Sequence, residues 1–169
     1  MKLKKIHSKE DISDEDEEDG YLIDADEKTA RSIIASLKSK GKTDKVIAVL
    51  GRDNTFNRRA LETLQIDYLV SPELGERKDT LHQRDSGLNH VLAKIAKEKD
   101  IAIVIDFKDW NSIKDKKEKA RRLARIIQNV KICRKAKCKI KIWGSDDKRL
   151  LKSFGFSLGM SSEQVRDCC

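Results

Sequence analysis

The chain alternates short apolar runs with stretches of helical spacing, and this alternation constrains its fold more than any other feature. From residue 46 onward, each strand-length apolar run is followed by a helical stretch. We predict strands at 46–50, 68–71, 101–107 and 140–143, and helices at 55–64, 86–99, 114–137, 147–154 and 161–166. Parallel strands joined by right-handed crossovers produce this order. The sequence therefore predicts an α/β fold.

The front of the chain adds shorter elements to this pattern. We predict strands at 2–7 and 21–24 and a helix at 27–40, which ends before Gly41. Five or six strands are fewer than a complete eight-stranded barrel requires. The 169 residues contain one Pro, eight Gly and no linker-like stretch. We therefore expect a single domain over 1–169.

An acidic block separates the first two predicted strands. Between Glu10 and Asp19, eight of ten residues are acidic, and such a run repels itself. We expect residues 9–20 to form a mobile surface insert that buries no side chain. The first thirty residues contain eleven acidic residues and five lysines, although the whole chain has a net charge of +8. The rest of the chain is therefore strongly basic and attracts polyanions.

The basic charge is concentrated on the longest predicted helix. Residues 114–141 contain thirteen Lys or Arg and only two acidic residues. Helical spacing predicts an apolar arc formed by Ala120, Leu123, Ala124, Ile127 and Val130. It places these polar residues on the opposite side: Arg121, Arg122, Arg125, Gln128 and Asn129. Lys131 and Arg134 fall inside the apolar arc, and the pattern does not explain them. An arginine ridge suits phosphate groups, so we predict contact with nucleic acid.

Membrane and secretory features are missing from the sequence. No apolar run approaches the roughly twenty residues of a spanning helix, and no signal-peptide pattern is present. The four cysteines then indicate free thiols in a reducing compartment, so we expect a cytoplasmic protein with no membrane partner. The separation of Cys133 and Cys138 does not match the C-x₂-C spacing of structural zinc.

A metal-dependent phosphoesterase is the enzymatic alternative, because four side chains in the loops after the strands could gather around a divalent ion. They are Asp53, Glu73, His82 and Asp106. The chain has three histidines, and no pair stands at the H-x-H or H-E-x-x-H spacing. It also has no G-x-S-x-G elbow, P-loop or dinucleotide fingerprint. We expect the protein itself to bind no metal or cofactor.

One long segment resembles a known family. The sequence SPELGERKDTLHQRDSGLNHVLAKIAKEKDIAIVIDF, residues 71–107, closely resembles the archaeal and eukaryotic ribonuclease P protein component 3 family. The later segments RRLARIIQNV at 121–130, CRK at 133–135 and GMSSEQV from Gly159 resemble the same family in the same order. The resemblance covers about residue 46 to the C-terminus, whereas the first forty residues match poorly.

The resemblance implies a fold, a function and partners. The family fold is a TIM-barrel-like fold related to the polymerase and histidinol phosphatase (PHP) superfamily without its metal-binding histidines, and here we expect a reduced (β/α) barrel. The acidic insert, the short front end and the bulky Trp143 depart from the family pattern. The implied function is to bind and stabilise the RNA that removes the 5′ leader of precursor tRNA. Hydrolysis would be done by the RNA subunit with magnesium. Ribonuclease P RNA, precursor tRNA and other protein subunits, especially a small ferredoxin-like subunit, would be the partners.

The predicted site combines these motif residues with the loop and helix cations. No residue is predicted to be catalytic. The predicted RNA-binding residues are Arg52, Arg77, Lys78, His82, Arg84, Arg121, Arg122, Arg125, Lys131 and Arg134. The predicted partner-facing or structural residues are Ser86, Asn89, His90, Gln128 and Asn129. A basic scaffold that binds any RNA without specificity stays open as a further alternative.

Overall fold

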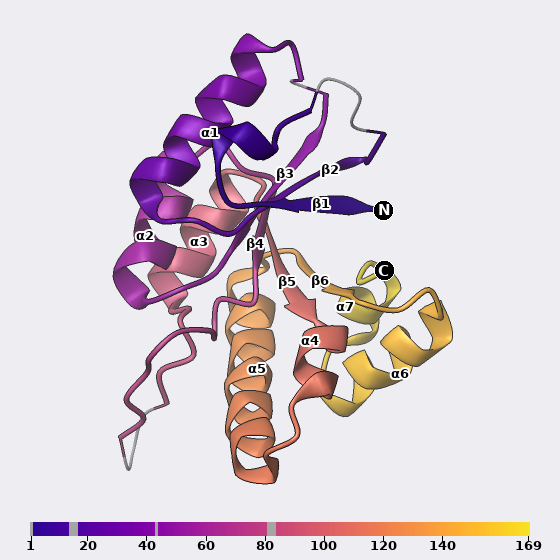
Figure 1. The fold of residues 1–169 in the computed structure, drawn as a ribbon. Helices are drawn as coiled ribbons and strands as arrows, with labels where there is room; N and C mark the ends of the chain where they lie inside the picture. The colour runs from indigo at the N-terminus through magenta and orange to yellow at the C-terminus, as the bar shows by residue number, and fades with distance from the viewer. Residues whose placement is uncertain (1, 14–16, 43, 81–83) are drawn as a thin grey trace.

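The computed structural model describes residues 2–13, 17–42, 44–80 and 84–169. Within them, all strands form one parallel sheet in the order β1-β2-β3-β4-β5-β6 (Figure 1). The strands are β1 (Leu3–Ile6), β2 (Gly20–Ile23), β3 (Val46–Leu50), β4 (Tyr68–Val70), β5 (Ala102–Asp106) and β6 (Ile140–Trp143). The helices are η1 (Lys9–Asp11), α1 (Glu27–Ser39), α2 (Asn54–Thr63), α3 (His90–Glu98), α4 (Phe107–Ser112), α5 (Lys116–Ala136), α6 (Lys148–Ser157) and α7 (Ser162–Arg166). None of the described helices is both long enough and apolar enough to span a membrane.

The two faces of the sheet have different side chains. Ile23, Val49, Leu69 and Ile103 stand in register on successive strands and belong to the main core, together with the buried sides of the helices. The other face has a small cluster of three buried side chains, Ala48, Val70 and Val104, bordered by partly buried apolar residues. Because side chains alternate along a strand, one set faces the helices, and the other, the small cluster with Leu22, Tyr68 and Trp143 beside it, lines the inside of the curved sheet.

The predicted fold class is confirmed. The strands are parallel and alternate with helices, and the sheet is barrel-like but does not close. The strand order never reverses, so the carboxyl ends of all six strands lie along one rim. In barrels this rim is where the loops form the working face.

Three predictions about the elements need correction. Helix α3 begins at His90 and is capped by Asn89, whose side chain accepts from the Leu92 amide, so it starts later than the predicted residue 86. The cause is Gly87, whose φ of 75° is not helical. Helix α4 was not predicted, and it takes in Phe107, which the sequence placed in a strand. Its N-cap is Asp106.

The acidic insert is partly packed against the rest of the protein. Residues 9–11 form η1, and Ile12 is 5% exposed and belongs to the main core. The expectation that the insert buries no side chain is therefore wrong at Ile12. The carbonyl oxygen of Glu18 accepts from Lys45 Nζ at 2.7 Å. Residues 14–16 lie outside the described residues, and the mobility of the insert stays a prediction.

We predict that Gly87→Ala destabilises the protein severely. A Cβ at this position would lie 1.8 Å from the Pro72 carbonyl oxygen and 2.4 Å from an Arg77 guanidinium nitrogen. Gly159→Ala is the matched control, because Gly159 also has a positive φ of 82° but has open space around its Cβ position. The backbone strain of either substitution costs about 1–2 kcal/mol, and overpacking at Gly87 adds about 1–3 kcal/mol. Urea unfolding measures the free energy of unfolding of both variants. Equal losses in the two variants would contradict the close packing described around Gly87.

Candidate nucleic-acid interface

A long loop joins β4 to α3 and dominates the carboxyl rim of the sheet. Residues 71–89, here called the β4–α3 loop, leave the sheet beside α5 and return to it (Figure 1). The loop begins at Ser71, a fully buried residue with a φ of 49°. A non-glycine residue with this φ is strained, and such strain often accompanies a functional site. Residues 81–83, including the predicted site residue His82, lie outside the described residues.

The first contact of this loop with α5 is a buried ion pair. Arg122 Nε donates to Glu73 Oε1 at 3.1 Å, and Nη1 of the same guanidinium contacts Asp109 Oδ2 at 2.6 Å. Burial raises the pKa of Glu73, and the charge of Arg122 offsets part of this effect. Burial also acts to lower the pKa of Arg122, but the two carboxylates overcome it and raise the pKa. Oε2 of Glu73 is buried without a hydrogen-bond partner among the described residues.

A second pair lies one helical turn further along α5. Arg125 donates to both carboxylate oxygens of Asp79, from Nε at 3.2 Å and from Nη2 at 3.1 Å. The Asp79 carboxylate also accepts from the Asp85 amide at 2.9 Å. Burial acts against the charged form of Asp79, but Arg125 and the amide bond together lower its pKa. This pair fixes the outer part of the loop against α5.

The buried side chain of Arg77 holds the two ends of the loop together. Its side chain is 0% exposed. Nη1 contacts Asp85 Oδ1 at 2.9 Å, Nε donates to the Leu74 carbonyl at 2.9 Å, and Nη2 donates to the carbonyl oxygens of Arg52 and Pro72. Burial lowers the pKa of Arg77, and Asp85 opposes the shift. One guanidinium therefore joins both ends of the loop to the segment after β3.

The predicted arrangement of α5 is wrong for three polar residues. Arg122, Arg125 and Asn129 lie on the buried side of the helix with Ile126 and Val130, whereas the sequence placed them opposite the apolar arc. The helical period alone cannot identify this face, because the loop packed against it is itself polar. The loop provides carboxylates and carbonyl groups that satisfy the arginines.

Two buried amides complete the support of the loop. Asn57 on α2 donates to the carbonyl oxygens of Pro72 and Gly87, at 2.8 Å and 3.1 Å. Asn129 on α5 donates to the Ser86 carbonyl at 3.0 Å. Ser86 is itself 1% exposed. The predicted structural role of Ser86 and Asn129 is compatible with these contacts.

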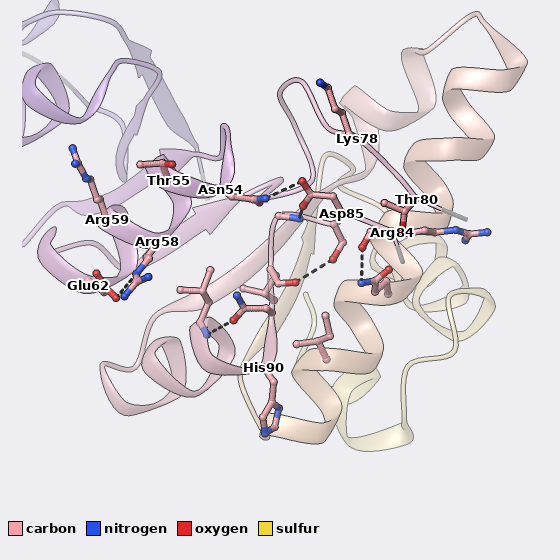
Figure 2. A pocket seen from close by; sticks show the side chains of 17 residues that line it. Asn54, Thr55, Arg58, Arg59, Glu62, Lys78, Thr80, Arg84, Asp85 and His90 are labelled. Carbon is pink, nitrogen blue, oxygen red and sulfur yellow. Dashed lines mark hydrogen bonds and ion pairs between the residues drawn. The ribbon is translucent and has the colours of Figure 1, made fainter. Parts of the chain in front are cut away.

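The outer side of the loop borders a groove on the helix-covered face. This basic groove has a volume of about 850 Å³ and lies between α2, the loop, α3 and α5. Figure 2 shows Arg58 and Arg59 on the α2 side of the groove, Lys78 and Arg84 on the loop, and His90 at the start of α3. Four cations therefore face two carboxylates, those of Glu62 and Asp85. The floor contains Leu88, Leu92 and Ile132.

The cations around the groove differ in how far they are neutralised. Arg58 pairs with Glu62 at 2.8 Å and Arg59 with Glu27 at 2.9 Å. Lys78 and Arg84 are exposed, and within the described part of the chain neither side chain has an ion-pair partner. Gln128 donates to the Arg84 carbonyl at 3.1 Å and so positions this residue.

The remaining predicted cations are spread over the surface. Arg121 is exposed and, with Lys78, lines an open cleft of about 1120 Å³ whose other arginines are the three ion-paired ones. Arg52 Nη2 contacts Asp24 Oδ1 at 2.8 Å at the rim of the sheet. Lys131 and Arg134 are exposed near the end of α5. The structure thus brings Lys78, Arg84, Ser86, Asn89, His90 and Gln128 together at the groove, and it places Arg52, Arg121, Lys131 and Arg134 elsewhere on the surface.

Three of the four residues of the metal alternative have other partners, and the fourth, His82, lies outside the described residues. Asp53 caps α2 by accepting from the Phe56 amide at 2.7 Å, and Asp106 caps α4 by accepting from the Asp109 amide at 2.9 Å. Glu73 is paired with Arg122. Among the described residues, no three His, Cys, Asp or Glu side chains are placed to hold a metal ion.

Sequence reasoning missed Arg58, Arg59 and Asn57. Both arginines follow the capped start of α2, and an exposed arginine pair on a short helix is common on protein surfaces. Asn57 carried a weak signal, because an amide next to Phe56 in an amphipathic helix can turn inward. Its two carbonyl partners are distant in sequence, so they could not be predicted.

Comparisons with known proteins agree with the resemblance seen in the sequence. No protein-family model matches the chain. Curated homologues are named ribonuclease P protein component 3. The one from Methanocaldococcus jannaschii is 37% identical over 90 residues, which are 53% of this chain and 35% of that protein. The one from Methanococcoides burtonii is 42% identical over 69 residues, 41% of this chain and 25% of that protein. The chain therefore matches well under half of each relative's length.

Solved structures share the fold. A chain in the cryo-EM structure of archaeal ribonuclease P with mature tRNA superposes with a TM-score of 0.67 at 24% identity, covering 88% of this chain and 63% of that chain. The crystal structure of an uncharacterized protein gives a TM-score of 0.52 at 12% identity, covering 77% of this chain and 34% of that one. The recognised resemblance is confirmed by the homologues, and the fold by the structures.

We predict that Arg122→Met lowers the free energy of unfolding by about 3–5 kcal/mol, because it leaves the Glu73 carboxylate buried without a cation. Without Arg122, the folded-state pKa of Glu73 lies still further above its unfolded value, so stability is lost as pH rises through it. The loss should therefore be larger at pH 8 than at pH 5 in urea unfolding. The double variant Glu73→Leu, Arg122→Met should recover most of the loss, since apolar residues replace the whole pair. A single variant as stable as the parent at pH 8 would contradict the buried pair.

Proposed function

We propose that this chain is a protein subunit of ribonuclease P. It binds and stabilises the catalytic RNA that removes the 5′ leader of precursor tRNA. The observation that carries the proposal is the homology to proteins named ribonuclease P protein component 3, together with a basic groove beside the loop segment that carries the resemblance. The fold shared with a chain of archaeal ribonuclease P is consistent with it.

The protein's contribution in this proposal is charge and shape. Lys78 and Arg84 present unneutralised cations beside the groove, and phosphate contacts of this kind position a protein on RNA without reading its sequence. The loop beneath them is held by three buried arginines, so the backbone that carries these cations is positioned before RNA binds. Preorganisation of this kind reduces the entropy lost on binding.

We propose further that cleavage is done by the RNA subunit with magnesium. In keeping with this, Asp53 and Asp106 act as helix caps and the Glu73 carboxylate is shared with Arg122. Precursor tRNA and other protein subunits, including a small ferredoxin-like subunit, would be partners in the complex. Four free thiols favour a reducing, cytoplasmic setting.

Reconstitution tests the proposal. Ribonuclease P RNA and the other subunits are assembled with and without this chain, and 5′ cleavage of precursor tRNA is followed at low magnesium. We expect cleavage to depend on the chain, because the added cations offset phosphate repulsion in the RNA. The isolated chain should not cleave with Mn²⁺. Cleavage by the chain alone, lost on Asp106→Ala, would instead support the metal-dependent phosphoesterase.

We predict that the double variant Lys78→Gln, Arg84→Gln weakens binding to ribonuclease P RNA. A hydrogen bond to a charged group contributes about 1.5–3 kcal/mol, so the loss of one such bond raises the Kd about tenfold or more. The slope of log K against log salt should fall by about one for each lost phosphate contact. Lys28→Gln, Lys38→Gln on the exposed side of α1 is the matched control and should leave both quantities unchanged. Equal binding by both double variants would count against the groove.

A further inference from the structure

A second cationic cavity lies across α5 from the groove. This basic hollow, of about 510 Å³, is formed by the end of α5, the start of β6 and α7. Its cations are Arg134, Lys137, Lys139 and Lys141, and its carboxylates are Glu163 and Asp167. Four cations again face two carboxylates, as they do in the basic groove.

The cations of the hollow are only partly neutralised. Lys139 pairs with Asp100 at 2.5 Å, and Lys141 Nζ donates to the Asp167 carbonyl at 3.1 Å. The Asp167 carboxylate is paired with Arg166 at 3.0 Å. Lys137 has no ion-pair partner among the described residues. The hollow therefore keeps a positive excess.

Lys137 occupies an unfavourable backbone position. It ends α5 with φ 56° and ψ 38°, the left-handed conformation in which helix ends usually have glycine. Glycine would adopt it without strain, so a lysine here sacrifices stability for a charged side chain. The negative end of the helix dipole favours cations in its last turn. The dipole does not account for Lys139 and Lys141, which come after the helix, Lys141 on β6.

The exposed side of α5 connects the two cavities. Gln128 and Ile132 line the groove, whereas Arg134 lines the hollow. At about 100° per residue, Arg134 projects roughly 120° away from Gln128, and Lys131 and Lys135 project between them. Both of these lysines are exposed. The cations therefore form one band that crosses the end of α5.

Among the described residues that line the two cavities none is Phe, Tyr or Trp, and His90 at the groove is the one ring present. Unpaired bases are usually held by stacking on aromatic rings, so these surfaces are suited to phosphate backbones instead. The two cavities open on either side of the exposed crest of α5, where Lys131 and Lys135 stand between them. A single backbone strand would have to cross the crest of the helix, whereas a duplex offers two backbones side by side.

We propose that the end of α5, around Lys131 and Lys135, lies across the shallow minor groove of a base-paired RNA segment. The basic groove holds one phosphate backbone, and the basic hollow holds the other. The shallow minor groove of A-form RNA leaves both backbones accessible to a protein surface. This inference rests on the proposed function, and it specifies double-stranded RNA as the form of RNA that this surface recognises.

The test is strand-resolved footprinting of the full chain on ribonuclease P RNA, whose folded form admits one orientation of the chain, and the affinity for a short RNA duplex is measured beside it. We compare the groove variant Lys78→Gln, Arg84→Gln with the hollow variant Arg134→Gln, Lys137→Gln, and use Lys28→Gln, Lys38→Gln as control. The parent should protect a segment of each strand across one minor groove. Each cavity variant should lose protection on a different strand and bind about tenfold more weakly. Loss on the same strand, or unchanged affinity and protection of both strands in the hollow variant, overturns the inference.

The variant Lys137→Gly distinguishes the loss of a charge from a loss of folding stability. It removes the cation and relieves the backbone strain, so the melting temperature should rise or stay equal while duplex affinity falls several-fold. Retention of the parent affinity overturns the role of Lys137. If the parent binds neither the duplex nor ribonuclease P RNA, the proposed function fails first. If it binds both and only the strand pattern differs, the present inference alone fails.

Discussion

Three buried guanidinium groups hold the β4–α3 loop, and the rest of the candidate site depends on them. Arg77, Arg122 and Arg125 each pair with a carboxylate of the loop or its neighbour and are almost completely enclosed. Isolated buried charges are very costly, so such pairs are stable only when the surrounding groups complete their hydrogen bonds. Here loop carbonyls accept from Arg77 and Arg125, and Asp109 and the Ser71 hydroxyl accept from Arg122. The packing of the loop and the packing of the arginines therefore depend on each other.

The sequence predicted the fold well because strand and helix periodicity are local properties. The strands at 46–50 and 140–143 are confirmed residue for residue, and the open barrel follows from their order. The candidate site was harder to predict, because a run of cations on a helix looks the same whether its arginines face water or carboxylates from a distant loop. Arg122 meets Glu73 across 49 residues of sequence. Only the tertiary structure separates the structural arginines from Lys78 and Arg84, which remain available to a polyanion.

The basic residues of this chain therefore fall into two groups, one enclosed and one exposed. The enclosed arginines fix the shape of the loop, and the exposed lysines and arginines give the surface a positive electrostatic potential. This division is suited to a protein that assists an RNA: the shape is fixed before binding, and the phosphates meet cations that are not already neutralised. The helix-capping roles of Asp53 and Asp106 agree with a supporting role, since those carboxylates stabilise helix ends.

Ultraviolet crosslinking of the full chain to ribonuclease P RNA, read out by mass spectrometry of the crosslinked peptides, tests this account most directly. The account predicts crosslinks at Lys78, Arg84 and the exposed end of α5, and none at Arg77, Arg122 or Arg125. Crosslinks concentrated on the three enclosed arginines would show that the loop opens to RNA, and an absence of crosslinks to this RNA would contradict the proposed function itself.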